Sequence, residues 1–99
     1  MASGIAGDVV LQPVSPVERP GSSNSRPYRA LIGVVDKAGR TIAEVRSDAA
    51  GRFEIVLEPG TYVVRPESTA IYPHARAQTI TVAEGRFTPV HIVYDSGIR

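Results

Sequence analysis

Two histidines, His74 and His91, carry the side chains of this sequence best suited to move a proton or bind a metal ion near neutral pH. A catalytic histidine is normally oriented by a carboxylate and placed beside a nucleophile. Neither histidine has an evident aspartate partner in the sequence, and no Gly-x-Ser-x-Gly turn is present to expose a serine. His74 falls in a loop, and His91 faces outward on a predicted strand. The pattern therefore favours two surface histidines over a catalytic or metal-binding pair.

Single carboxylates lie near predicted turns, at Asp36, Asp48, Glu58 and Asp95. A calcium site would need several oxygens converging from one loop, whereas these stand alone and are interpreted as turn caps. The sequence contains no cysteine, which excludes disulfides, thiolate metal sites and cysteine nucleophiles. We expect no metal, no cofactor and no catalytic residues.

The charge balance gives no sign of a polyanionic partner. Formal net charge is +1, and the basic residues are arginines apart from Lys37. Arg29, Arg46, Arg65 and Tyr72 could form a basic, aromatic sheet surface for nucleic acid. Acidic residues are interleaved with them, at Glu44, Glu54 and Glu67, so a solvated sheet face is favoured and nucleic acid is not an expected partner.

No membrane-spanning or targeting segment is expected. No apolar run approaches the roughly 18 residues of a membrane span. The first residues have neither the basic nor the apolar region of a signal peptide, so the chain is either cytoplasmic or a mature domain with a new start. Residues 1–99 fit one domain, with 1–4 expected to be a disordered start.

Short segments of alternating apolar and polar residues, separated by Gly and Pro turns, predict an all-β fold. We expect seven strands, at Ile5–Gln12, Pro27–Asp36, Arg40–Ser47, Arg52–Leu57, Thr61–Arg65, Ala77–Val82 and Arg86–Tyr94. Tight turns at Gly39 and Gly51 favour antiparallel hairpins, and Pro89 implies that its N–H side faces solvent or a bulge. The predicted fold is a seven-stranded antiparallel Greek-key sandwich. Its core is predicted to contain Ile32, Val45, Phe53, Ile55, Tyr62, Ile80 and Ile92.

Two turn motifs carry a family resemblance. Ser47-Asp48-Ala-Ala-Gly51-Arg52-Phe53 is followed by Leu57-Glu58-Pro59-Gly60-Thr61-Tyr62. Together they resemble carboxypeptidase-regulatory-like and collagen-adhesin B-type domains, which have transthyretin-like or Ig-like sandwiches. Asp48 is expected to cap its turn, and Tyr62 to bury its ring with the hydroxyl bonded to nearby backbone.

The resemblance extends to a bacterial branch of that family, through the segments 16–21, Arg26-Pro27-Tyr28 and Tyr94-Asp95-Ser96-Gly97-Ile98-Arg99. It implies a secreted or lipid-anchored surface protein. Relatives often carry a cysteine pair that would staple the Pro13–Arg26 connection. Here Ser15 and Ser23-Asn24 occupy those places, so we expect Pro13–Arg26 to be the most mobile segment.

Two alternatives follow from the same resemblance. Transthyretin-related hydrolases or small-ligand carriers share the sandwich and act as oligomers. They end in Tyr-Arg-Gly-Ser and need a first-strand histidine, and both features are missing here. Adhesin domains form an internal Lys–Asn isopeptide bond, but Lys37 falls in a turn and Asn24 in a long loop, away from any dry strand face.

The sequence thus predicts a non-catalytic extracytoplasmic module, more often monomeric than oligomeric, that either binds another protein or a cell-surface glycan or acts as a structural spacer. Its contact surface is predicted in the irregular segments Pro13–Arg26 and Pro66–Ala75. Tyr and Arg concentrate binding energy in interfaces, so the candidate binding residues are Tyr72, Arg76, Arg19 and Arg26.

Overall fold

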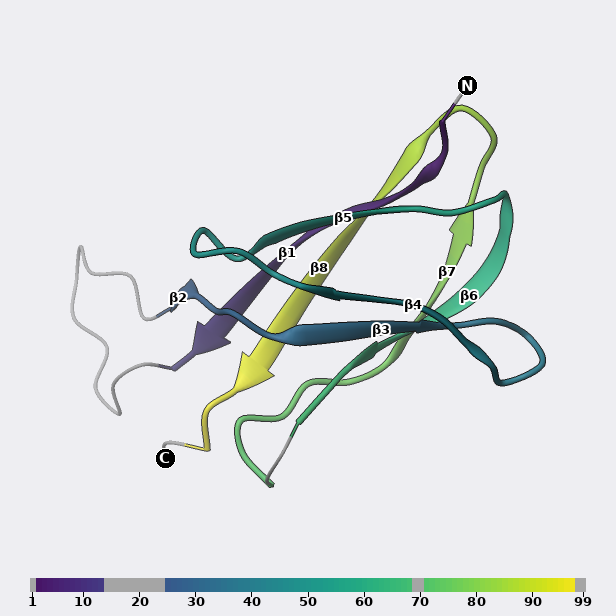
Figure 1. Ribbon diagram of the computed structural model, residues 1–99. Helices are drawn as coiled ribbons and strands as arrows, with labels where there is room; N and C mark the ends of the chain where they lie inside the picture. Colours follow the sequence, from purple (N-terminus) through teal and green to yellow (C-terminus); the bar gives the residue numbers. More distant parts are fainter. Residues whose placement is uncertain (1, 14–24, 69–70, 98–99) are drawn as a thin grey trace.

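Alternation of apolar and polar residues gives eight β-strands in a computed structural model that describes residues 2–13, 25–68 and 71–97 (Figure 1). No helix occurs among these residues. The strands are β1 (Gly4–Gln12), β2 (Arg26–Pro27), β3 (Leu31–Val35), β4 (Thr41–Arg46), β5 (Arg52–Val56), β6 (Gly60–Pro66), β7 (Gln78–Val82) and β8 (Phe87–Asp95).

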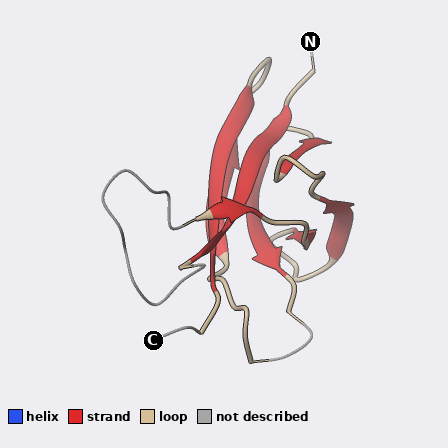
Figure 2. Cartoon of the chain, turned by 90° about the vertical axis from the view of Figure 1, so that its left-hand side faces the viewer, coloured by secondary structure: helices blue, strands red, loops and turns tan. Residues whose placement is uncertain are grey.

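The strands form two four-stranded sheets that pack as a sandwich (Figure 2). In the first sheet β1 is central, with β5 and β2 on one edge and β8 on the other. The second sheet has the order β4-β3-β6-β7. The predicted all-β sandwich is confirmed.

Two details differ from the sequence-based expectation. The β1–β8 pair is parallel, whereas we expected antiparallel pairs throughout. The segment predicted as one strand, Pro27–Asp36, divides into β2 in the first sheet and β3 in the second. The chain passes from the first sheet to the second between β2 and β3, and buried Ser47 stabilises this passage. Its hydroxyl donates to Tyr28 O (2.7 Å) and accepts from Ala30 N–H (2.8 Å).

The core lies between the sheets and follows the predicted period of two. Its fully buried apolar side chains come from both layers: Tyr94, Ile5, Ile32, Ile92, Val9, Val34, Val64 and Val82. Of the seven core residues predicted, five are buried, while Val45 and Ile80 are partly buried and pack against the rest.

The turn chemistry agrees with the sequence. Asp48 Oδ1 accepts hydrogen bonds from Ala50 N–H and Arg52 N–H, both at 2.9 Å. Asp36 makes the equivalent bonds to Ala38 and Arg40, and the Arg40 N–H bond is the main reason why the pKa of Asp36 is lowered. The two caps explain why single carboxylates stand at these positions.

Tyr62 forms the predicted corner. Its side chain is buried, and its hydroxyl donates to Glu58 O at 2.5 Å. The bond closes the Glu58–Tyr62 turn across Pro59-Gly60, so the ring can enter the core without leaving its polar atom unpaired.

Pro89 lies at the outer edge of the first sheet. Even-numbered residues of β8 bond to β1, as Gly4 N–H to Arg86 O and Ser96 N–H to Gln12 O show at the two ends. Odd-numbered residues direct their backbone groups the other way, as in the Asp95 bonds with His74. The N–H that Pro89 lacks would therefore point away from the ladder, as predicted.

Candidate functional site

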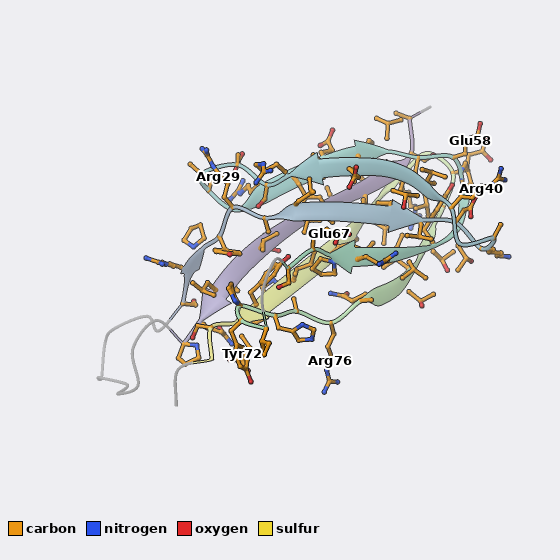
Figure 3. All side chains as sticks on the ribbon, turned by 60° about the horizontal axis from the view of Figure 1, so that its bottom comes forward. Arg29, Arg40, Glu58, Glu67, Tyr72 and Arg76 are labelled. Carbon is orange, nitrogen blue, oxygen red and sulfur yellow. The ribbon has the colours of Figure 1, made fainter. Side chains whose placement is uncertain are left out.

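The segment after β6 presents the most exposed large apolar residue of the part of the chain that the structure describes. Ile71 is 81% exposed and Tyr72 46% exposed. Arg76 is also exposed, and Figure 3 shows it pointing away from the sheets on the same side of the molecule as Tyr72. We call Ile71, Tyr72 and Arg76 the 71–76 surface.

This surface is attached firmly to the sandwich. His74 and Asp95 exchange backbone hydrogen bonds of 3.0 and 2.6 Å, which ties the segment to the end of β8. The Ser68 hydroxyl donates to Pro73 O. The Tyr72 ring packs on Gly97, where an added Cβ would lie 2.7 Å from the ring. The backbone that carries the side chains of the 71–76 surface is thus fixed to the end of β8 by hydrogen bonds and packing.

A depression of about 660 Å³ adjoins the 71–76 surface, between the segment that leads into β7 and the outer side of β8. Arg76, His74, His91 and Val93 line it together with Asp95. Gln78 closes one side, since its Nε2 donates to His91 O at 2.7 Å.

Of the two other predicted binding residues, Arg26 belongs to the part of the chain that the structure describes. Arg26 is exposed on β2, opposite Leu11 of β1. β1 and β8 therefore lie between it and the segment bonded to Asp95. Arg19 lies outside the described residues, as does most of the Pro13–Arg26 connection.

A carboxylate–imidazole pair on the outer side of the first sheet escaped the sequence analysis. His91 Nδ1 lies 2.9 Å from Asp8 Oδ2, and both side chains are about half exposed. In the strand register Asp8 stands between His91 of β8 and Arg52 of β5. The signal that could have found the pair is the shared outward phase of Asp8 and His91, but only if β1 and β8 were already known to be neighbours.

A larger depression, about 920 Å³, covers this row and reaches the β4–β5 turn, with Arg46, Asp48 and Glu54 among its lining residues. His91 lines both depressions. Among the residues that the structure describes, no serine, threonine, cysteine or lysine lines either one. The Asp8 carboxylate thus orients the imidazole, and the pair is placed to make polar contacts in both depressions.

The described residues contain no cluster of side chains that could bind a metal ion. Within residues 2–13, 25–68 and 71–97, no group of three or more His, Cys, Asp or Glu side chains is placed to hold an ion. Over the same ranges, every buried side-chain nitrogen or oxygen has a hydrogen-bond partner. Lys37 is exposed in the β3–β4 turn, and Asn24 lies outside the described residues.

Two packed sheets with first and last strands side by side define an Ig-like β-sandwich domain. Among solved structures, the chain is similar to a minor pilin of the Gram-positive pathogen Streptococcus agalactiae, with a TM-score of 0.69 and 16% sequence identity. The similarity covers 96% of this chain and 44% of the pilin, so the chain spans less than half of that protein's length.

No family model and no curated protein matches the sequence. The described part of the chain has no helix long and apolar enough to cross a membrane. The comparisons give no support to a transthyretin-related hydrolase.

Proposed function

We propose that this chain is a non-catalytic structural module of an extracytoplasmic protein, and that it contacts a partner protein through the 71–76 surface. The observation that carries the proposal is the exposure of Ile71, 81%, on a segment whose backbone is bonded to β8. Covering a large aliphatic side chain with a partner removes apolar surface from water, which makes the free energy of binding more favourable.

The chemistry of the 71–76 surface favours a protein over a glycan. Tyr72 and Arg76 are residue types that concentrate binding energy at protein interfaces, and Ile71 supplies an aliphatic centre between polar neighbours. A glycan would instead be recognised by an exposed aromatic face with convergent hydrogen bonds. The ring of Tyr72 packs one side on Gly97, which reduces the face it can offer.

Membership of the carboxypeptidase-regulatory-like family is part of the same proposal. The Asp48 cap and the Tyr62 corner are the two structural features that its motifs require, and both are present. Location outside the cytoplasm is supported by that resemblance and by the similar fold of the minor pilin.

A photoreactive amino acid in place of Ile71 should form a protein adduct in the producing cells, while one in place of Val56 should not. Val56 is a matched control because it is 69% exposed and apolar but lies on β5, outside the 71–76 surface. Once the partner is purified, Arg76→Ala should weaken binding about ten-fold or more, whereas Arg26→Ala should leave it unchanged.

Equal labelling from both positions would indicate a generally adhesive protein and contradict the assigned surface. Absence of any adduct at position 71 would do the same. An adduct that a glycosidase removes would identify a glycan as the partner.

Protease added to intact cells should degrade an epitope-tagged form of the full-length protein if the module lies outside the cytoplasm. A cytoplasmic protein of the same cells is the control and should survive. Survival of the tagged protein until the cells are lysed would contradict the proposed location.

A further inference from the structure

The longest strand pairing of the fold joins its first and last strands. All nine residues of β1 pair with all nine of β8, from Gly4 opposite Phe87 to Gln12 opposite Asp95, without a register shift. Hydrogen bonds from Gly4 N–H to Arg86 O (3.0 Å) and from Ser96 N–H to Gln12 O (3.2 Å) reach the two ends. At about 3.3 Å per residue, the ladder is roughly 30 Å long.

The parallel direction decides how tension would act on this ladder. Figure 1 shows β1 and β8 side by side and running the same way, so Gly4 and Asp95 lie at opposite ends of the pairing. A pull between chain attached before Gly4 and chain attached after Asp95 would slide one strand along the other. Such a pull loads all the hydrogen bonds of the ladder at the same time, because each of them joins β1 to β8 roughly across the direction of the force.

Both strands are also held on their other edges. β1 pairs with β5 and with β2 on the edge opposite β8. Between these two pairings, the Val9 N–H donates to Gly51 O at 2.6 Å and the Tyr28 N–H donates to Val9 O at 3.0 Å. Two hydrogen bonds from side chains to backbone join β8 to β7: Gln78 Nε2 donates to His91 O, and the Thr88 hydroxyl donates to Thr81 O.

Buried side chains add resistance to sliding. Ile5 and Val9 of β1 and Ile92 and Tyr94 of β8 are almost inaccessible to solvent. A slip of one residue would turn each buried side chain of the moving strand to the outside, so the register has no nearby alternative minimum.

We infer that this module bears tension along its β1–β8 axis, and that the parallel ladder between its first and last strands resists the force. The biological use of that property rests on the proposed structural role, but the property itself does not depend on the 71–76 surface. A failed cross-linking experiment would therefore leave this inference standing, and a weak ladder would leave the partner contact standing.

Single-molecule pulling in two geometries tests the inference. The sequence has no native cysteine, so handles can be attached through Ala2→Cys with Arg99→Cys, or through Ala2→Cys with Glu84→Cys. The first pair shears β1 against β8. The second pulls their starts apart and opens the ladder pair by pair, because Glu84 lies in the turn that leads into β8.

The shearing geometry should give a rupture force about two-fold or more above the opening geometry at equal pulling speed. Ala2 and Glu84 are exposed and outside the strands, and denaturant midpoints equal to the parent's provide the folding control. Equal rupture forces in the two geometries, or a lower force in shear, would overturn the assignment.

Discussion

Replacing Gly7 by alanine should lower the free energy of unfolding by about 2–4 kcal/mol. Gly7 lies in the middle of β1, where an added Cβ would be 2.5 Å from Val90 O of β8 and 2.5 Å from the ring of buried Phe53. The carbonyl belongs to the β1–β8 ladder and cannot turn aside without breaking it. Denaturant unfolding monitored by circular dichroism measures the loss.

Gly33→Ala is the matched control, since Gly33 also lies inside a central strand. An added Cβ there would meet Glu67 Oε1 at 3.4 Å and Arg65 O at 3.7 Å, which are ordinary contact distances. The change should be neutral or stabilise by up to about 1 kcal/mol through the unfolded chain. Similar losses in both variants would show that a general strand effect, rather than close strand approach, acts at Gly7.

Replacing Tyr94 by alanine should cost about 3–5 kcal/mol, the range found when a buried aromatic ring is removed. Tyr94 is 1% exposed, its ring centroid lies 4.9 Å from that of Tyr28, and its hydroxyl donates to Glu67 O at 2.7 Å. The variant would lose the ring contact and leave a cavity between the sheets. A loss of unfolding free energy below about 1 kcal/mol, measured by denaturant unfolding, would contradict this packing.

The hydroxyl of Tyr94 should also make stability depend on alkaline pH. Burial, followed by the effects of Tyr28 and Glu67, raises the pKa of Tyr94 from 10.0 to about 12. Below pH 10 both states keep the proton and the contribution is fully present. Between pH 10 and 12 the unfolded chain releases it first, so stability should fall by about 1–3 kcal/mol. Tyr94→Phe keeps the ring but should lack this part of the fall.

Sequence patterns were sufficient wherever the determinant was local. Asp48 and Gly51 specify their turn by a side-chain cap and a positive φ of 76°. Tyr62 stands four residues after the carbonyl it bonds. Period-two alternation then placed Ile32 and Ile92 in the core, because each strand buries one face whichever neighbour it pairs with.

Long-range pairing explains what the sequence missed. Asp8 and His91 are separated by 83 positions, and only the parallel register of β1 and β8 brings their side chains to 2.9 Å. Alternation gives the face of each residue but not the identity or direction of the neighbouring strand.

The division of Pro27–Asp36 has a different cause. Tyr28, Ala30, Ile32 and Val34 keep one inward phase through the whole segment, so periodicity gave no sign of a break. The chain nevertheless crosses between sheets, and the Ser47 hydroxyl satisfies Tyr28 O and Ala30 N–H where the ladders cannot. A single buried hydroxyl far along the chain is not visible in a local pattern.

Pro89 and the contacts beside it have a consequence for molecules crowded at high local density. Exposed strand margins can recruit a neighbour's backbone and start fibre growth. Along the outer edge of β8, Pro89 has no N–H, the N–H and the carbonyl of Asp95 are bonded to His74, and the carbonyl of His91 accepts from Gln78. Many copies could therefore stand close together on a surface without pairing strands through the outer edge of β8.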